Sequence, residues 1–550
     1  MIIIVKMKEE TMKLTFPSLF NETVRKNGDA TAYSFAGEEA ISYSRAADMI
    51  SDLSAFLRSA GISHGDRVAI LSTNMPAWPV AYFAITFMGA VAVPILPDFS
   101  ATEVFNVLEH SGSRAIFISS GLLPKIETAR PETLRMLIRI EDFSMISPDK
   151  LPDNPEPVSF SPEKTEVNED DLAAIIYTSG TTGRSKGVML THRNICFNAL
   201  RGKMIQDIGE NDRFLSVLPL SHTYENTLGL ILPMLGGACV YYLRKPPTPP
   251  VLLPALEAVR PTMMLTVPLI IEKVYFNKIL PAFRDKIILR LLYTIPLFRK
   301  ILNAAAGRKL MKTFGGCLKF YGIGGSKLNR VVEKFLREAK FPYAVGYGLT
   351  ETAPLLAGAN PAETVFESTG PAIQGIELIV NNPDKKTGEG EIWARGPSVM
   401  KGYYKEPEMT AEVLTAGGWL KTGDLGVLDN KGNLFIRGRL KNMIVGASGE
   451  NIYPEEIEAV INNFRFVVES LVIQQKGRLV ALVHLNMEEL EKKYHHMRND
   501  LEKKKEEFLA ELKEYVNSQV NKFSRIYSVM IHSSPFEKTA TMKIKRFLYS

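Results

Sequence analysis

The stretch YTSGTTGRSKG, residues 177–187, combines three glycines with five serine or threonine hydroxyls and ends with a lysine and a glycine. The apolar run DLAAIIYT (171–178) overlaps its start and predicts a buried strand, while VMLTH (188–192) predicts a second strand or the start of a helix. Glycine lets the backbone turn sharply or approach a ligand, and hydroxyls, amides and a cation attract anions. The loop therefore predicts phosphate binding.

The Walker type of phosphate loop is a different motif. Counting from Gly180, Ser185 stands where that motif needs glycine, and Gly187 stands where it needs serine or threonine. The positions of the loop expected to face phosphate are Thr178, Ser179, Gly180, Thr181, Thr182, Gly183 and Lys186.

Length and composition predict a globular protein of more than one domain. A chain of 550 residues exceeds one ordinary core, and 45% hydrophobic residues suffice to build several. Lysine and arginine number 66 against 60 acidic residues, a net charge of +6 that is mild for this size. We therefore expect no nucleic-acid partner.

Cysteine usage and apolar runs predict a cytoplasmic protein. Cys196, Cys239 and Cys317 are far apart, which argues against both disulfides and a zinc site. The N-terminus has too few consecutive apolar residues for the core of a signal peptide. Met7 or Met12 is an alternative candidate for the first residue of the protein. The longest apolar run, 228–243, contains proline and glycines and is expected to be buried core.

Helical and strand patterns alternate along most of the chain, which predicts an α/β fold with doubly wound parallel sheets. From about residue 370 the pattern changes to short strands and turns, and beyond Arg439 a smaller α+β unit follows. We expect a large N-terminal domain, 1–440, of two doubly wound sheets with a β-rich subdomain at about 370–440. A small mobile C-terminal domain is expected over 441–550.

Two segments have marked charge patterns. Residues 488–514 mix both signs at helical spacing, which favours a solvated helix face. Residues 281–312 carry eight basic residues and one acidic residue, a local charge of +7, so the remaining chain sums to −1. Because aliphatic residues lie between these charges, 281–312 is compatible with peripheral contact with an anionic membrane or with a solvated helical insertion.

Four further stretches carry polar groups suited to a nucleotide. GYGLTETAP (346–354) offers an aromatic ring, a hydroxyl and a carboxylate, and KTGDLG (421–426) places an aspartate on a tight turn. The segment 436–458 adds arginine, lysine and a Gly/Ser turn, and KTATMKIKR (538–546) ends the chain in lysines.

Together with the phosphate loop, these motifs resemble the adenylate-forming (AMP-binding) superfamily of acyl-CoA synthetases, luciferases and peptide-synthetase adenylation domains. The resemblance runs from about residue 20 to the last few residues, with the motifs in the family's order. LPLSHTYEN (218–226), GYGLTET and TATMKIKR look most like long-chain fatty acyl-CoA synthetases. An amino-acid-activating domain would be expected to show an aspartate near 222–226, where this chain has none.

The resemblance implies a two-step reaction with ATP, Mg²⁺ and coenzyme A. A fatty acid carboxylate attacks the α-phosphate of ATP to give acyl-AMP and pyrophosphate, and a thiol then takes the acyl group. By similarity the phosphate loop holds the β- and γ-phosphates, Glu351 binds Mg²⁺ and Thr350 contacts the α-phosphate. Lys543 matches the catalytic lysine, which would hold the carboxylate against the α-phosphate.

The remaining implied roles concern the nucleotide, the hinge and the acid. The residues carried over are Tyr347 and Gly348 against adenine, Gly324 and Gly325 beside it, Asp424 and Arg439 on ribose, Lys441 at the hinge, Gly449 in the turn that admits the thiol, and His222 at the ligand site. The acid pocket is expected to be lined by residues from 222–240, 263–275 and 318–326.

The chain departs from the family pattern in the segment 436–458 and in KTATMKIKR (538–546). Met542 replaces the usual glycine before the catalytic lysine, and Ala540 replaces a common proline, so Lys545 is an alternative for the catalytic position. Ala447 begins a turn, Ala-Ser-Gly, where Ser-Gly-Gly is frequent.

The main functional hypothesis is an AMP-forming long-chain fatty acid:CoA ligase. One alternative within the same fold is transfer to an acyl carrier protein or release of the acyl-adenylate. Another, of a different class, is a catalytically silent regulator that binds nucleotide or lipid. The presence of Glu351, Asp424 and Lys543 weighs against the silent regulator.

Overall fold

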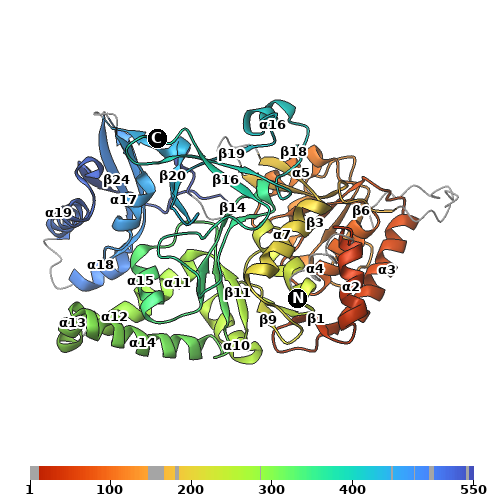
Figure 1. Ribbon diagram of the computed structural model, residues 1–550, viewed down its shortest axis with the longest axis horizontal. Helices are drawn as coiled ribbons and strands as arrows, with labels where there is room; N and C mark the ends of the chain where they lie inside the picture. The colour runs from red at the N-terminus through yellow and green to blue at the C-terminus, as the bar shows by residue number, and fades with distance from the viewer. Residues whose placement is uncertain are drawn as a thin grey trace.

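A computed structural model describes residues 12–146, 166–179, 185–284, 286–446, 450–475, 477–494, 501–539 and 544–549. Two seven-stranded sheets, a four-stranded sheet and a three-stranded sheet lie among helices in this part of the chain (Figure 1). The predicted α/β class is confirmed. The expected boundary at residue 440 stays a prediction, although β20 ends at Arg439.

The first large sheet carries the phosphate loop between two of its strands. Its order is β18-β8-β7-β4-β3-β5-β6, and β4, β3, β5 and β6 run parallel, as alternating strands and helices predict. β7 and β8 instead pair antiparallel, with Thr178 opposite Lys186, because the connection between them is too short for a parallel crossover. The strands are β3 Arg67–Leu71, β4 Val91–Ile95, β5 Ala115–Ile118, β6 Met136–Arg139, β7 Leu172–Ser179, β8 Ser185–Thr191 and β18 Gly402–Tyr403.

The second large sheet has the order β13-β12-β11-β9-β10-β1-β2, with a parallel run from β13 to β1. Asn74, just beyond β3, ties the first sheet to it, since its amide donates to the Leu218 carbonyl at 2.6 Å and accepts from the Leu220 N–H at 2.9 Å. The strands are β1 Thr31–Phe35, β2 Ile41–Ser42, β9 Arg213–Leu215, β10 Cys239–Tyr242, β11 Met263–Thr266, β12 Phe320–Ile323 and β13 Tyr343–Val345.

Helices join these strands and begin where the sequence provides caps. The Ser42 hydroxyl accepts from the Arg45 N–H at the start of α3, and Ser100 and Glu103 form a reciprocal capping box on α5. The helices that cover the sheets are α2 Phe16–Asn27, α3 Tyr43–Ser59, α4 Ala77–Phe87, α5 Ala101–Ser111, α7 His192–Ile205, α10 Pro249–Val259, α11 Pro268–Val274, α14 Pro296–Thr313 and α15 Arg330–Glu338.

Most strands of the predicted β-rich stretch form one antiparallel sheet, β16-β17-β19-β20, whereas β18 joins the first large sheet. Its strands are β16 Glu377–Asn381, β17 Gly390–Arg395, β19 Leu420–Leu428 and β20 Leu434–Arg439. The last part of the chain builds a three-stranded sheet with helices, as the α+β pattern predicts. Its elements are β23 Val467–Gln475, β24 Arg478–Leu485, β25 Ser528–Ile531, α17 Pro454–Ile461, α18 Met487–Tyr494 and α19 Leu501–Gln519.

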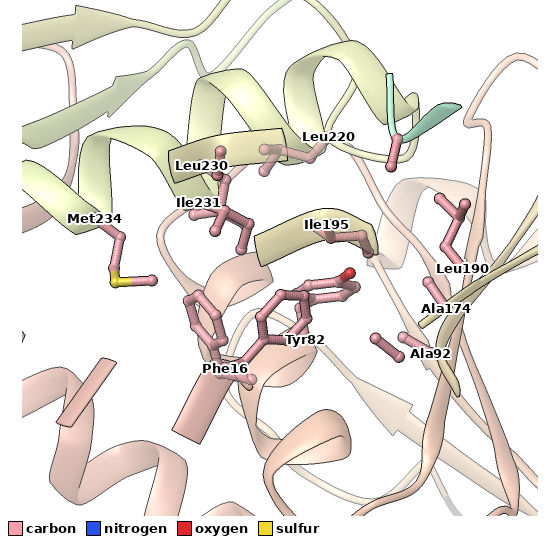
Figure 2. Packing of buried hydrophobic residues seen from close by; sticks show 14 of the residues in the cluster. Phe16, Tyr82, Ala92, Ala174, Leu190, Ile195, Leu220, Leu230, Ile231 and Met234 are labelled. Carbon is pink, nitrogen blue, oxygen red and sulfur yellow. The ribbon is translucent and has the colours of Figure 1, made fainter. Parts of the chain in front are cut away.

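A dense apolar core lies between the two large sheets and the helices around them. Figure 2 shows Phe16, Tyr82 and Ile195 side by side, contributed by α2, α4 and α7. The rings of Phe16 and Tyr82 lie 5.7 Å apart, and both side chains are fully buried. Each such side chain contributes about 1.5–3 kcal/mol through burial.

The longest apolar run of the sequence is part of this core, as expected. Leu230, Ile231 and Met234 of this run are fully buried (Figure 2). No helix in the described ranges combines the length and the apolar character needed to cross a membrane.

Asn198, fully buried on α7, connects this core to the loop that follows β13. Its side-chain amide donates to the carbonyls of Thr352 and Leu355 at 3.1 and 2.8 Å and accepts from the Leu355 N–H at 3.1 Å. Three main-chain groups away from water thus find partners in one side chain, which fixes the segment that contains Thr350 and Glu351.

We expect Asn198→Ala to lower the apparent Tm by several degrees, since each buried polar group left without a partner costs about 1–3 kcal/mol. Differential scanning fluorimetry measures this, with Asn430→Ala, at an exposed asparagine, as the matched control. Equal Tm values for the two variants would contradict the assigned role of Asn198.

Candidate active site

Three predicted nucleotide ligands meet at one edge of the β-rich sheet. The Tyr347 hydroxyl donates to Asp424 Oδ2 at 2.7 Å, and Arg439 Nε lies 2.8 Å from Asp424 Oδ1. Asp424 on β19 and Arg439 on β20 are directly opposite each other in the strand register, which explains their pairing. Burial, with the charge of Asp424, raises the pKa of the Tyr347 hydroxyl well above its ordinary value, so that group stays a donor.

The main chain around Tyr347 is tightly packed. Gly348 follows it in the short strand β14 Tyr347–Gly348, which pairs with β15 Leu355–Ala357. A Cβ atom at Gly348 would lie 1.8 Å from the Pro354 carbonyl oxygen, so only glycine fits there. Tyr347 is therefore held in a fixed place relative to the segment that carries Glu351.

Glu351 lies beside two groups from the first large sheet. It follows Thr350 in the single turn η4 Thr350–Thr352, and its Oε1 accepts from the Tyr403 hydroxyl at 2.8 Å. Lys186 Nζ lies 4.9 Å from the centre of the Tyr403 ring. The loop lysine, the predicted metal ligand and a tyrosine of β18 are thus neighbours.

Tyr347 and Glu351 are four positions apart in the chain, which connects this group with the nucleotide edge. The charge of Arg439 lowers the pKa of the Tyr347 and Tyr403 hydroxyls. At Tyr403, burial and the charge of Glu351 have a larger effect than the charge of Arg439. They raise the pKa of the Tyr403 hydroxyl well above its ordinary value. The structure therefore gathers Lys186, Glu351, Tyr347, Asp424 and Arg439 in one site.

The phosphate loop itself is described only at its two ends. Thr178 and Ser179 end β7, and Lys186 lies near the start of β8. Gly180, Thr181, Thr182 and Gly183 lie outside the described residues, and their roles stay predictions. The main chain of β8 is held in place by the Tyr404 N–H, which donates to the Gly187 carbonyl at 2.8 Å.

The predicted glycine pair after β12 faces the segment 222–226. Gly324 donates its N–H to the Thr266 carbonyl, and Gly325 has a φ of 87°, a left-handed conformation that suits glycine. A Cβ atom at Gly324 would lie 3.1 Å from the ring of Tyr224. His222 caps the short helix α8 Thr223–Glu225, where its Nδ1 accepts from the Tyr224 N–H at 3.3 Å.

An apolar cavity of about 60 Å³ lies beside these residues. Tyr224, Gly322 and Gly346 line it, which brings it next to Gly324 and Tyr347 in the chain. No charged side chain lines it among the described residues. The remaining lining residues include Ile205, Phe214, Leu228, Leu232, Met263, Leu265, Phe320, Ile323, Leu355 and Gly358.

The described residues fit magnesium only with substrate oxygens as further ligands. Within the described ranges there is no group of three or more histidine, cysteine or acidic residues that could hold a metal. Mg²⁺ usually binds through one or two carboxylates together with substrate phosphates and water. Glu351, whose partner Tyr403 also contacts the phosphate-loop lysine, matches that pattern.

Residues predicted in the C-terminal part are only partly described. Lys441 lies in the turn η5 Leu440–Asn442, directly after β20, and is exposed. Lys543 and Gly449 lie outside the described residues, so their roles stay predictions. Lys327 contacts Glu456 of α17 at 3.1 Å, and Asn329 contacts Asn463, just after α17, at 2.7 Å.

Comparison with known proteins identifies the family. The sequence profile of the AMP-binding enzyme family matches residues 20–404. The chain belongs to the AMP-binding enzyme family. This AMP-binding chain is 30% identical to long chain acyl-CoA synthetase 7, peroxisomal, of Arabidopsis thaliana, over 95% of this chain and 81% of that protein.

Other relatives of this AMP-binding enzyme differ in their acceptor. Long-chain-fatty-acid–[acyl-carrier-protein] ligase AEE15, chloroplastic, of Arabidopsis thaliana is 27% identical, over 96% of this chain and 84% of that protein. Among solved structures, o-succinylbenzoate CoA synthetase of Bacillus subtilis with its acyl-adenylate has the same fold, with a TM-score of 0.75 at 22% identity. The match covers 97% of this chain and 98% of the Bacillus chain.

Two site neighbours were not found by sequence reasoning. Tyr403 lies 52 positions after its partner Glu351, and the only signal was the pair of aromatic residues in GYYKEP (402–407). Glu225 lies in LPLSHTYEN (218–226), a stretch whose pattern does not predict its burial. Its Oε2 is buried without a hydrogen-bond partner among the described residues, and burial raises the pKa of Glu225 to about 8, partly offset by a hydrogen bond with Ser216.

The raised pKa of Glu225 predicts a pH-dependent stability. Between the ordinary pKa of 4.5 and about 8, the folded protein keeps a proton on Glu225 that the unfolded chain releases, so stability falls as pH rises. We expect Glu225→Gln to have a Tm close to the wild type at pH 5 and a higher Tm at pH 8.5, by scanning fluorimetry at about 0.15 M salt. An unchanged pH profile in the variant would contradict this assignment.

Proposed function

We propose that the protein is an AMP-forming ligase that activates a long-chain fatty acid with ATP and Mg²⁺ and transfers the acyl group to coenzyme A. The observation that carries the proposal is the apolar cavity beside Gly324 and Tyr347, with no charged lining among the described residues. Such a cavity suits a carboxylate with an aliphatic tail, because an unpaired charge there would be costly.

Different residues have different proposed roles in the first step, the formation of acyl-AMP. Tyr347, Asp424 and Arg439 hold the adenosine part, with Asp424 accepting from the ribose hydroxyls. Lys186 and the loop amides bind the β- and γ-phosphates, and Thr350 contacts the α-phosphate. Glu351 holds Mg²⁺, which neutralises phosphate charge when bound. Lys543 places the carboxylate against the α-phosphate, so that cations and donors act where charge shifts.

The cavity must widen to accept such an acid. Pockets for drug-sized ligands measure about 300–1,000 Å³, whereas this one measures about 60 Å³. The aromatic and leucine side chains that line it, such as Tyr224 and Leu228, can change rotamer more readily than the backbone can shift. The fatty acid tail would then lie between η2 Asn226–Ile231 and the strands β11 and β12.

The second step uses the C-terminal unit, 441–550, rotated about Lys441. The contacts of Lys327 and Asn329 with this unit are polar, and the Tyr453 hydroxyl adds a hydrogen bond to Glu389 at 2.7 Å, so these polar contacts would have to break in the rotation. Rotation would remove Lys543 from the site and bring the 446–451 turn, with Gly449, to the acyl-adenylate. One site can thus serve both steps.

The reaction is tested by pyrophosphate release with a series of carboxylic acids, with and without coenzyme A. The proposal expects release with long-chain acids and a thioester only when coenzyme A is present. Release without thioester would favour a carrier-protein ligase or an acyl-AMP ligase, a possibility supported by the carrier-protein ligase among the relatives. No release with any acid would favour a silent regulator.

We expect Lys543→Ala to lower the rate of pyrophosphate release by at least about a hundredfold, because it removes the cation that aligns carboxylate and phosphate. ATP binding by calorimetry should stay within about threefold, because the substitution leaves Tyr347, Asp424 and Arg439 in place. Lys545→Ala is the matched control, since Lys545 interacts with Glu537 at 3.8 Å and should retain activity. Loss of activity in Lys545→Ala alone would move the role to that residue.

We expect Gly358→Leu to shift the preference toward shorter acids. A Cβ atom at Gly358 would lie at ordinary contact distances of 3.4 and 3.6 Å from Ile205 and Leu355, so the added side chain fills the cavity without a backbone clash. The ratio of kcat/KM for long over short acids should fall at least about tenfold, as about 1–3 kcal/mol per methylene predicts. Gly121→Leu, in an open surface position, is the control and should leave the ratio unchanged.

A further inference from the structure

A helical hairpin carries an unusual apolar surface. It spans residues 286–312 and consists of α13 Ile287–Thr294 and most of α14 Pro296–Thr313, which runs along the lower edge of the molecule in Figure 1. Ile287 and Ile288 are each 73% exposed and Leu297 is 66% exposed. The exposed aliphatic and aromatic side chains of the hairpin are Ile287, Ile288, Leu291, Ile295, Leu297, Phe298 and Ile301.

The opposite side of the hairpin is fixed to the body of the protein. Arg299 pairs with Glu338 of α15 at 2.9 Å, and Asn303 donates to the same carboxylate at 2.7 Å. Tyr293 donates to Asn303 at 3.0 Å, which connects α13 to α14. The apolar side chains are therefore exposed on a hairpin that is attached to the rest of the protein by side-chain contacts.

Exposed basic residues lie among the exposed apolar residues of the hairpin and on both sides of them along the chain. Arg299 is occupied by Glu338, but the other cations of this region are exposed and have no ion pair with an acidic residue in the described ranges. These cations are Arg284, Lys286, Arg290, Lys300, Arg308, Lys309 and Lys312. Water solvates the cations well. The free energy of the aliphatic groups between them falls only when an apolar phase removes them from water.

We propose that the hairpin docks the protein on the surface of a lipid bilayer that contains anionic phospholipids. Its aliphatic side chains would lie at the boundary between headgroups and acyl chains, and its lysines and arginines would reach lipid phosphates. An anionic bilayer can contact both the apolar and the basic side chains of the hairpin, because it offers negative charge and hydrocarbon at adjacent depths.

A second copy of the chain is a poorer partner for this surface. In a twofold dimer the same surface of each subunit meets, so the cations of one hairpin would face the cations of the other. An acidic carrier protein would match the charges but would have to cover seven large apolar side chains as well. The docking proposal does not depend on the acid that the enzyme activates, because binding to vesicles needs no substrate.

Cosedimentation of the full chain with vesicles tests the proposal. The vesicles are phosphatidylcholine alone and phosphatidylcholine mixed with phosphatidylglycerol, each at low and at high salt. We expect binding to the mixed vesicles at low salt, weaker binding at high salt, and little binding to phosphatidylcholine alone, since basic residues near an anionic surface supply much of the attraction.

Two triple variants separate the two halves of the surface. Lys286→Glu/Arg290→Glu/Lys300→Glu should lower the partition coefficient on mixed vesicles by about a hundredfold or more. Ile287→Ser/Ile288→Ser/Leu291→Ser should lower it by at least about tenfold while its salt dependence remains. These side chains are exposed, so the variants should fold, and scanning fluorimetry checks that they do.

Matched controls carry the same changes elsewhere on the surface. Lys385→Glu/Lys386→Glu/Lys431→Glu reverses three exposed charges on the β-rich sheet, and Val468→Ser/Met530→Ser/Ile531→Ser removes three exposed apolar side chains from the C-terminal sheet. Both controls should bind vesicles to within about threefold of the wild type. The charge control changes the net charge as much as the hairpin charge variant does, so a difference between these two variants reports the position of the charges.

Several results would overturn the proposal. Absence of binding to mixed vesicles at low salt is one, and binding that the hairpin variants do not weaken more than the controls is another. Sedimentation velocity without vesicles gives a third, since a dimer lost in the Ile287/Ile288/Leu291 variant would make the hairpin a contact between copies. Saturable binding of purified acyl carrier protein that the charge variant abolishes, with no vesicle binding, would assign the surface to that protein.

Discussion

A buried carboxylate that must be paired decides how the site is built. Asp424 is almost fully buried, and it is satisfied from two sides, by the Tyr347 hydroxyl and by the Arg439 guanidinium. Tyr347 follows the last strand of the second large sheet, whereas the other two residues belong to neighbouring strands of the β-rich sheet. Leaving such a charge without partners would cost several kcal/mol. The two sheets are therefore held together at the place where the nucleotide is proposed to bind.

The fold class and much of the site could be predicted from the sequence, because they depend on local patterns. The alternation of apolar runs and helical spacing predicted the α/β sheets, and the glycine and hydroxyl content of 177–187 predicted a loop between strands. The direction of β8 could not be predicted, since an apolar run reads the same in parallel and antiparallel pairing.

Contacts between distant segments were the part that local patterns could not supply. Tyr403 reaches Glu351 because β18 is added beside β8, and the pairing of these two strands has no signature in either one. The burial of Glu225 depends on Gly229, which brings the backbone so close that a Cβ there would lie 2.6 Å from the carboxyl carbon. The roles of Lys543 and Gly449 stay predictions, because those residues lie beyond the described part of the chain.

The close approach of Gly348 to Pro354 has a mechanical consequence for catalysis. Gly348 of β14 touches the main chain of Pro354, two residues after the turn that carries Thr350 and Glu351, with no side chain between them that could adapt. The parts of the site that are proposed to face adenine and to bind the metal are therefore closely tied to each other. A reaction in two steps with different geometric demands cannot be served by flexing this pair of parts. The change of geometry has to come from outside it, through parts that are attached by side-chain contacts such as those of Lys327, Asn329 and Tyr453.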